Sequence, residues 1–349
     1  MHMADALLAP TVAAAMYAAS GTAAGLSIHR LKRESDPQRL PTMAVTAALV
    51  FAGQMINYTI PGTGSSGHIC GGMLLAALLG PEAGFLSMVV ILTIQCLFFA
   101  DGGLMALGAN VWNMAFYGCF VGYYLLWRPI MGGRRAGVGR QSQRRRIMAA
   151  SILGCVVSLQ LGAFSVVLET SLSGITDLPF GAFAALMQPI HLAIGLVEGL
   201  VTAAVLVFVY SARPELLRDA ADGGQQPAKL SLRSIVVILA AAAIVIGGGL
   251  SLLASSAPDG LEWSLFGNAE AGYAENMGLD EDDFGLESTA ADRAASIQER
   301  VSFLPDYSFA GSDAPAGTSV AGIVGAAMVA GAAALICLAG GLIRKKKRP

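Results

Sequence analysis

Long runs of apolar residues recur along most of the chain and are separated by shorter polar stretches. Each run is about the length of an α-helix that crosses a bilayer, so the pattern predicts an all-α integral membrane protein. The third run is short and begins at Gly71-Gly72, which predicts a helix that enters the membrane below an irregular loop. We predict nine transmembrane segments, at about residues 8–28, 40–58, 69–80, 83–100, 104–127, 147–168, 188–210, 234–253 and 320–343.

The composition supports a membrane protein, because 55% of the residues are hydrophobic and only 13% are charged. The lipid bilayer is therefore an expected partner, and no nucleic-acid partner is expected. All five cysteines lie in apolar stretches and form no CxxC pair, so we interpret them as small core residues.

Lysine and arginine set the predicted orientation. All but two of the 22 basic residues follow the first, fifth, seventh or ninth segment, and these places share one side if the segments alternate. Only Arg293 and Arg300 fall on the other side. Basic residues gather in the cytoplasmic loops of membrane proteins. We therefore predict a multi-pass protein of the prokaryotic cell (inner or plasma) membrane, with its N-terminus outside and its C-terminus in the cytoplasm.

The spacing of the segments divides the chain into two modules. Residues 1–210 hold seven segments with short connections, and residues 211–233 form a polar cytoplasmic linker. Residues 234–349 hold two segments that flank an outside loop, about 254–319, with 13 acidic and 2 basic residues. Such a loop is usually a solvated and partly disordered surface, although its run Asp280-Glu281-Asp282-Asp283 could also attract cations. Within it, Ala290–Val301 is predicted to be helical, capped by the Ser or Thr just before it.

The first candidate for chemistry is the N-terminus. The α-amine of Met1, the main-chain nitrogen of His2 and the imidazole of His2 lie within reach of one metal ion. A fourth imidazole would complete a square of nitrogens, a geometry that suits Ni(II) or Cu(II). The bulky His2 also disfavours removal of Met1. The alternative is that His2 is a solvated residue at a chain end.

The fourth nitrogen is predicted to come from the loop Pro61-Gly62-Thr63-Gly64-Ser65-Ser66-Gly67-His68. Its glycines let the main chain bend tightly and approach another group closely, and His68 ends the loop on the outer side, where Met1 and His2 lie. Two alternatives remain. A phosphate-binding loop is disfavoured because the Lys of a Walker A motif is missing and the loop faces outside. A plain turn with a solvated His68 stays open.

Other polar residues could orient the ligands or the N-terminal strand without binding the metal: Ser65, Asp101, Asn110 and His191. Asp101 could instead be an ordinary helix-end residue, and Asn110 could bond to a neighbouring helix. Glu198 lies well inside the predicted membrane, where an ionisable residue hints at function, but it could equally be a structural hydrogen-bonding group. His191 and Glu198 share a helical face but lie about 10 Å apart along the axis, so they are not a contact pair.

Several motifs are missing from the sequence. Without a Walker A motif the chain is not expected to bind a nucleotide, and without HExxH it is not expected to be a zinc metalloprotease. The HxxxxDH motif of secondary nickel–cobalt permeases is absent as well. We therefore do not expect an enzyme; an intramembrane enzyme would have only His191 and Glu198 to support it.

Taken together, these residues resemble the substrate-binding membrane components of nickel/cobalt energy-coupling factor (ECF) transporters, the NikM/CbiM family. The resemblance covers about 1–210 and rests on these motifs: Met1-His2, Gly62-Thr63-Gly64-Ser65-Ser66-Gly67-His68, Phe99-Ala100-Asp101-Gly102-Gly103, Gly108-Ala109-Asn110, His191 and Glu198-Gly199. It implies a seven-helix component (S component) that captures metal from outside, with Met1, His2 and His68 as the ligands. It also implies a transmembrane coupling protein and cytoplasmic ATPase subunits as partners.

The second module resembles the small PDGLE component of these transporters, which is NikN-like. The resemblance rests on Pro258-Asp259-Gly260-Leu261-Glu262, with Pro305-Asp306-Tyr307 and Ala321-Gly322 further on. It implies an outside loop that reaches over the binding protein and helps to load metal.

The leading hypothesis is thus a fused metal-capture component of an ATP-driven Ni(II) importer, with Ni(II) as the transported substrate. Co(II) uptake for cobalamin synthesis by the same mechanism is the close alternative. A membrane metal sensor that binds metal without moving it is a further alternative, although the sequence shows no output domain.

Overall fold

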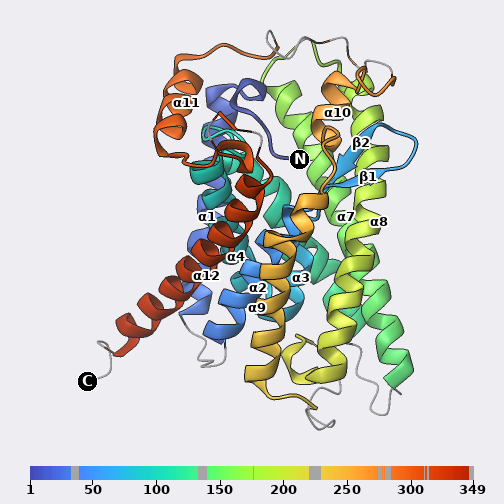
Figure 1. The fold of residues 1–349 in the computed structure, drawn as a ribbon, viewed down its shortest axis with the longest axis vertical. Helices are drawn as coiled ribbons and strands as arrows, with labels where there is room; N and C mark the ends of the chain where they lie inside the picture. Colours follow the sequence, from blue (N-terminus) through green and yellow to red (C-terminus); the bar gives the residue numbers. More distant parts are fainter. Residues whose placement is uncertain are drawn as a thin grey trace.

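The computed structural model describes the whole chain except residues 33–38, 133–139, 176, 220–228, 274–276, 278, 280–283, 310, 313 and 346–349. The run Asp280 to Asp283 and residues 220–228 of the predicted linker therefore lie outside the described residues. The described chain is mostly helical, and its long helices run side by side along the long axis of the molecule (Figure 1).

The elements divide at the predicted linker. Before it lie η1 (Asp5–Leu7), α1 (Pro10–Leu31), α2 (Arg39–Gln54), β1 (Tyr58–Ile60), β2 (Ser65–Gly67), α3 (Gly72–Leu79), α4 (Pro81–Phe99), α5 (Leu107–Val111), the π-helix η2 (Trp112–Trp127), α6 (Arg128–Met131), α7 (Arg140–Leu172), α8 (Phe180–Ala212) and η3 (Pro214–Leu216). After it lie α9 (Leu232–Gly248), η4 (Leu250–Leu253), α10 (Gly260–Phe266), α11 (Thr289–Val301), η5 (Pro305–Tyr307) and α12 (Ala316–Lys345).

A helix coincides with each of the apolar segments predicted from the sequence. Five described helices, in α1, α4, α7, α8 and α12, are long and apolar enough to cross a membrane, and α2 and α9 contain shorter apolar stretches. The protein is therefore a multi-pass membrane protein. The number of nine crossings stays a prediction.

Two helices extend well beyond their predicted bounds. α8 begins at Phe180, ahead of the predicted start at residue 188, and it carries Pro189 inside. In membrane helices, neighbouring polar groups satisfy main-chain groups near a proline. Gln160 of α7 does so here, because its Nε2 donates to the carbonyl of Gln188 at 2.8 Å. α7 likewise begins at Arg140 rather than at residue 147.

The glycine-rich loop forms a β-hairpin, which corrects the purely helical prediction. β1 and β2 pair antiparallel, with Tyr58 opposite Gly67. Gly62 and Gly64 adopt φ of 78° and 75° in the turn, a backbone region that side chains with a Cβ rarely occupy. The hairpin ends next to His68, so its register fixes where that imidazole lies.

The second part of the chain packs along the first through α2 and α4. α12 contacts α2, α4 and α9, and α9 contacts α2. α9 and α12 cross where Gly247 meets Gly322, since a Cβ on Gly322 would lie 2.0 Å from the carbonyl oxygen of Gly247. Small residues at such crossings let membrane helices approach closely.

The short helices of the second part cover one end of the bundle (Figure 1). α10 packs on α8 and β2, and α11 packs on α4 and η1. α11 confirms the helix predicted over 290–301, and Ser288 caps it by accepting from the Ala291 N–H. The N-terminus lies at this end, whereas α12 ends at the other.

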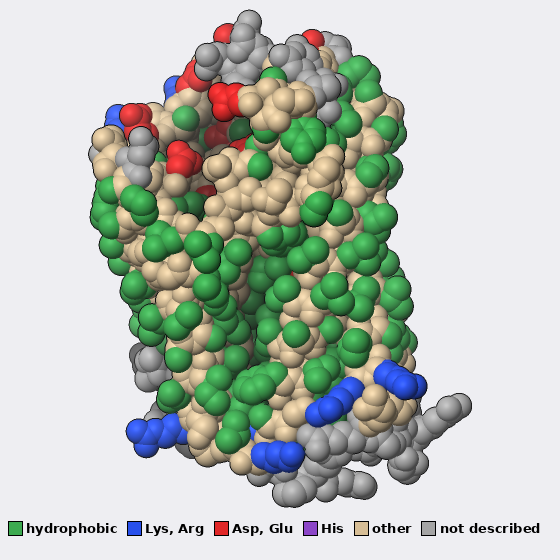
Figure 2. All heavy atoms as spheres, turned by 45° about the vertical axis from the view of Figure 1, so that its right-hand side comes forward, with side chains coloured by type: hydrophobic (Ala, Val, Ile, Leu, Met, Phe, Trp, Pro, Cys, Tyr) green, Lys and Arg blue, Asp and Glu red, His purple; other side chains and the backbone are tan. Residues whose placement is uncertain are grey.

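Charged residues separate along the long axis. On the face that Figure 2 shows, a broad hydrophobic band crosses the middle of the molecule, with the Asp and Glu side chains above it and most of the Lys and Arg side chains below it. A hydrophobic band with charges at both ends is the surface expected of a protein that spans a bilayer. The N-terminus lies at the acidic end.

Candidate metal-binding site

The N-terminal segment is buried at the acidic end of the bundle. Met1 and Met3 are 4% and 0% exposed, and Leu7 and Leu8 are buried behind them. A chain end is usually mobile unless contacts hold it in place. The burial of these side chains therefore shows that the first residues are packed into the fold.

Asn110 of α5 holds the main chain of this segment on both sides. Its Oδ1 accepts from the Met3 N–H at 2.7 Å, and its Nδ2 donates to the Met3 carbonyl at 3.2 Å. The same carbonyl accepts from the Gly103 N–H at 2.9 Å. A Cβ on Gly103 would lie 1.8 Å from Asp5 Oδ1, so only glycine lets the two strands approach this closely. The sequence suggested that Asn110 orients the N-terminal segment. In the structure its side chain contacts the main chain of this segment at Met3.

The rings of His2 and His68 stack, with their centroids 5.4 Å apart and their planes 18° from parallel. His2 Nδ1 lies 2.9 Å from Asp101 Oδ1, and its Nε2 is buried with no partner among the described residues. His68 Nδ1 lies 3.1 Å from the Ile69 carbonyl, which can only accept a hydrogen bond. Its proton therefore sits on Nδ1, and Nε2 carries a lone pair.

Asp259 of the second part of the chain reaches the same cluster. One of its oxygens, Oδ2, accepts a hydrogen bond from the Met1 amine and lies 3.9 Å from His68 Nε2. The other, Oδ1, accepts from the N–H groups of Leu261 and Glu262 and so caps α10. A single carboxylate therefore joins the helix start of the PDGLE sequence to the N-terminal amine.

Further side chains of the second part brace the loop after α4. Tyr307 donates to Asp101 Oδ2 at 2.5 Å, while the other Asp101 oxygen contacts His2. Gln298 of α11 donates to the Gly102 carbonyl at 2.7 Å. Asp101 thus lies between His2 and Tyr307 and connects the two parts of the chain.

Burial and charge set the protonation of the cluster. Burial alone would lower the pKa of the Met1 amine, but Asp259 outweighs it and the pKa is raised. Burial, then the neighbouring Met1 ammonium and His2, lower the pKa of His68 to about 4. Burial would raise the pKa of Asp101, but His2 and the Tyr307 hydroxyl lower it to about 2. At neutral pH His68 is therefore a neutral imidazole that can bind a metal.

No group of three His, Cys, Asp or Glu side chains in the described ranges lies close enough to hold a metal ion. Side chains alone therefore do not complete a site. The donors predicted from the sequence also include the Met1 amine and the His2 main-chain nitrogen. Met1 lines the same small cavity as His68, and the His2 ring stacks on the His68 ring.

Ser65 and His191 have different surroundings. Ser65 Oγ donates to the Ser66 carbonyl at 3.1 Å and to the Pro258 carbonyl at 3.4 Å, so it ties the hairpin to the PDGLE segment. His191 lines the same small cavity as Met1 and His68.

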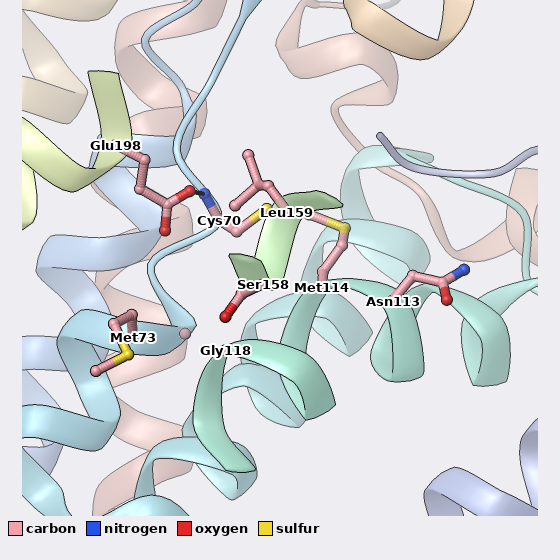
Figure 3. A pocket seen from close by; sticks show the side chains of 9 residues that line it. Cys70, Met73, Asn113, Met114, Gly118, Ser158, Leu159 and Glu198 are labelled. Atoms are coloured by element: carbon pink, nitrogen blue, oxygen red, sulfur yellow. Dashed lines mark hydrogen bonds between the residues drawn. The ribbon is translucent and has the colours of Figure 1, made fainter. Parts of the chain in front are cut away.

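Glu198 makes structural hydrogen bonds, one of the two roles that the sequence left open for it. Its two carboxylate oxygens accept from the N–H groups of Cys70, at 2.8 Å, and Gly71, at 2.9 Å, as Figure 3 shows for Cys70. These residues follow His68 directly, and Gly71 has φ of 82°. Glu198 thus holds the turn that places the His68 loop.

We expect Glu198→Gln to lower the free energy of unfolding by about 1–3 kcal/mol, because the new amide group faces an N–H donor that it cannot accept from. The shifted loop should also weaken metal binding. Denaturation in detergent and metal titration of the purified chain measure both effects. Glu82→Gln, at the opposite end of α4 from Asp101, is the control. Equal metal affinity in Glu198→Gln and the unsubstituted chain would contradict this role.

Asp259 and Tyr307 were missed as site residues. The spacing of Asp259 and Glu262 is that of a capping box, and the structure contains one at the start of α10. That signal predicts where a helix begins but says nothing of a contact with Met1, which is 258 positions away. Only the packing of α10 onto α8 and β2 brings the two together.

Comparison with known proteins identifies relatives of both parts of the chain. Residues 2–216 match the family described as "Cobalt uptake substrate-specific transmembrane region", CbiM. Residues 233–344 match the PDGLE domain.

One curated relative matches nearly the whole chain, and another matches a little over half of it. A putative fused nickel transport protein NikMN of Archaeoglobus fulgidus is 37% identical over 94% of this chain and 95% of its own length. A cobalt transport protein CbiM of Sorangium cellulosum is 33% identical over 62% of this chain and 94% of its own.

Solved structures share the fold over part of the chain. The crystal structure of a truncated transition metal transporter superimposes with a TM-score of 0.52 at 29% identity, and covers 60% of this chain and 99% of that one. The chain therefore belongs to the CbiM family of metal-transport proteins and carries a PDGLE domain behind its CbiM region.

Proposed function

We propose that the protein captures Ni(II) on the outer side of the cell membrane as the substrate-binding component of an ATP-driven ECF importer. The observation that carries this proposal is the buried cluster of the Met1 amine, His2 and His68 at the acidic end of the bundle. Together with the His2 main-chain nitrogen, these groups offer four nitrogen donors, a set that suits Ni(II) in square-planar geometry.

Metal capture exchanges the present partners of these groups for the metal. The Met1 amine leaves Asp259 and loses its proton when it binds the metal, and the His2 main-chain N–H loses its proton as well, so that two protons pass to solvent. A chelate that includes the main-chain nitrogen of His2 closes through Nδ1 of the same residue, so the His2 ring turns its Nδ1 from Asp101 towards the metal. Asp101 and Asp259 then remain close by and offset the charge of the cation.

The charge distribution supports the proposed orientation. In the proposed orientation the acidic end of the molecule, which carries the N-terminal cluster, faces outside. The end with Lys and Arg faces the cytoplasm. In this orientation the metal arrives at the cluster directly. The covering helices α10 and α11 then lie outside as well.

The partners belong to the same proposal. A transmembrane coupling protein and cytoplasmic ATPase subunits supply the work of import, because this sequence contains no Walker A motif. The PDGLE part acts on the capture step, since Asp259 contacts the Met1 amine and Tyr307 contacts Asp101.

Co(II) is the second candidate substrate, because relatives of the CbiM region include a protein named for cobalt transport. Two relatives named as fused proteins, in Archaeoglobus fulgidus and Rhodobacter capsulatus, are named for nickel transport. This favours Ni(II). A non-transporting metal sensor predicts that the chain does not copurify with ATPase subunits.

The test is accumulation of radioactive nickel and cobalt by cells that lack other uptake systems and carry this chain with its transport partners. We expect nickel accumulation that disappears when either this chain or ATP hydrolysis by the partner is removed. Excess unlabelled nickel should compete better than cobalt. Unchanged nickel accumulation without this chain would exclude the proposed function, and better competition by cobalt would reassign the substrate.

A further inference from the structure

α7 carries a buried carboxyl group that the proposed capture step does not use. Glu169 is 4% exposed and lies near the end of α7, inside the stretch that is long and apolar enough to cross a membrane. No salt bridge joins it to a basic group in the described part of the chain. A buried carboxylate without a cationic partner is costly, so an ionisable residue at this position calls for an explanation.

Asn113, in the first turn of η2, is a hydrogen-bond partner of Glu169. Its Nδ2 donates to Glu169 Oε2 at 2.8 Å. The other oxygen of each side chain, Glu169 Oε1 and Asn113 Oδ1, is buried without a hydrogen-bond partner among the described residues. Both of these oxygens can only accept if Glu169 is ionised, so neither can then satisfy the other.

One proton on Glu169 removes this mismatch. A protonated carboxyl group has an O–H donor and keeps an acceptor, and these complement the acceptor and the donor of an amide. Protonated Glu169 can therefore accept from Nδ2 of Asn113 and donate to its Oδ1. It also carries no charge, which removes the cost of burying an anion in the bundle.

Glu198, which is also buried in the bundle, faces different groups. Its two oxygens accept from two main-chain N–H groups, those of Cys70 and Gly71. Figure 3 shows the amide of Asn113 turned away from Glu198, although both residues line the same cavity. A carboxylate suits two donors, whereas one donor together with one acceptor suits the protonated form.

The pair of Glu169 and Asn113 lies against the N-terminal segment that carries the proposed ligands. Asn113 Nδ2 is 3.6 Å from Met3 Sδ. One turn after Glu169, Ser173 Oγ accepts from the Ala9 N–H at 2.9 Å and donates to the Glu169 carbonyl at 2.8 Å. This turn of α7 is thus connected to the segment at two places, through Asn113 at Met3 and through Ser173 at Ala9.

We propose that Glu169 carries a proton in the native fold and that this proton positions the N-terminal segment through Asn113. Glu169 is then a positioning residue, because it acts through Asn113. Without the proton, Asn113 Oδ1 lacks its donor and an anion lies behind Met3, so the segment packs less firmly. The consequence for nickel rests on the metal-capture function proposed above, whereas the consequence for the segment does not.

Infrared spectroscopy of the full chain, purified in detergent without metal, tests for the proton. The C=O stretch of a protonated carboxyl group is separate from the bands of carboxylates and amides. We expect such a band in the unsubstituted chain at neutral pH, its loss in Glu169→Gln and its retention in Glu198→Gln. If Glu169→Gln removes no such band, the proposal is overturned and the two oxygens are left to bound water.

The reactivity of the Met1 amine reports the position of the segment without metal. Met1 is 4% exposed, so an acylating reagent modifies its amine when the segment leaves the bundle. Glu169→Gln keeps a donor and an acceptor towards Asn113 and should react at the unsubstituted rate. Glu169→Leu leaves the Asn113 amide unpaired and should react about tenfold faster, because an unpaired buried polar group costs about that factor in an equilibrium constant. Mass spectrometry of the N-terminal peptide measures the rate, and Glu299→Leu, on the exposed surface of α11, is the matched control.

Two results would overturn the positioning role: Glu169→Gln that reacts as fast as Glu169→Leu, which would show that the charge is needed, or an amine that stays protected in Glu169→Leu. If Glu169→Leu does not fold, the infrared band and the amine reactivity of Glu169→Gln still decide. Nickel titration extends the comparison, with binding about tenfold weaker in Glu169→Leu and restored in Glu169→Gln. An unsubstituted chain that does not bind nickel would overturn the proposed function, while the band and the amine reactivity would still decide the role of Glu169.

Discussion

A chain extended by a short peptide ahead of Met1 is expected to lose nickel binding, even though every side chain is unchanged. The extension converts the Met1 amine into an amide and moves the chain end away from the cluster. Two of the four proposed nitrogens then no longer form the chelate. The loss should exceed the about 10- to 100-fold that removal of a supporting contact costs. Titration of the purified chain with Ni(II) measures it.

The buried position of the N-terminus makes this effect large. Met1 is 4% exposed, and its amine is held by Asp259, so an extension also has no room beside α10. The control is the same peptide placed after Pro349, which should bind nickel normally. Removal of the extension by a protease, so that Met1 is the first residue again, should restore binding. An extended chain that binds nickel as tightly as the original would rule out the amine as a ligand.

The second large effect is expected from His68→Ala. This substitution removes the nitrogen that the loop contributes and also the ring that stacks on His2. Nickel binding should weaken by more than about 100-fold, since a donor is lost rather than a supporting contact. The chelate of the N-terminal nitrogens remains, so His68→Ala should bind more tightly than the extended chain. Isothermal titration of both variants tests this order.

The matched control for His68→Ala is His29→Ala, because His29 is an exposed histidine in the last turn of α1. Its loss should leave nickel affinity unchanged. Thermal denaturation without metal shows whether His68→Ala still folds. A folded His68→Ala chain with normal affinity would exclude His68 from the donor set.

The helices were predictable because their signal is local. Apolar runs long enough to span a bilayer appear as α1, α4, α7, α8 and α12, and the short α11 appears where the sequence predicted a capped helix. Helix bounds were less predictable: the seventh segment was predicted to begin at residue 188, but α8 begins at Phe180 and continues through Pro189. A proline ends a helix in water more readily than in a bundle whose neighbours supply hydrogen bonds.

The hairpin shows a different reason for error. Its strands have three residues each, which is too short for an alternating pattern to be recognised. The Ser66 N–H donates to the Pro258 carbonyl at 2.8 Å, and Trp263 of α10 donates to the Thr63 carbonyl at 2.8 Å. The second part of the chain therefore stabilises a structure that the loop sequence alone does not specify.

The sequence by itself determined the membrane class and the family, and it supplied the proposed nitrogen donors, because these depend on residue type and on local order: an apolar run, a histidine at position two, a glycine-rich loop that ends in His68. Only the tertiary structure decided what surrounds the donors. Asp259 contacts Met1, Tyr307 contacts Asp101, Glu198 holds the loop after His68, and His191 opens into the shared cavity. Each of these features joins residues that lie far apart in the chain, and only the packing of the helices brings them together.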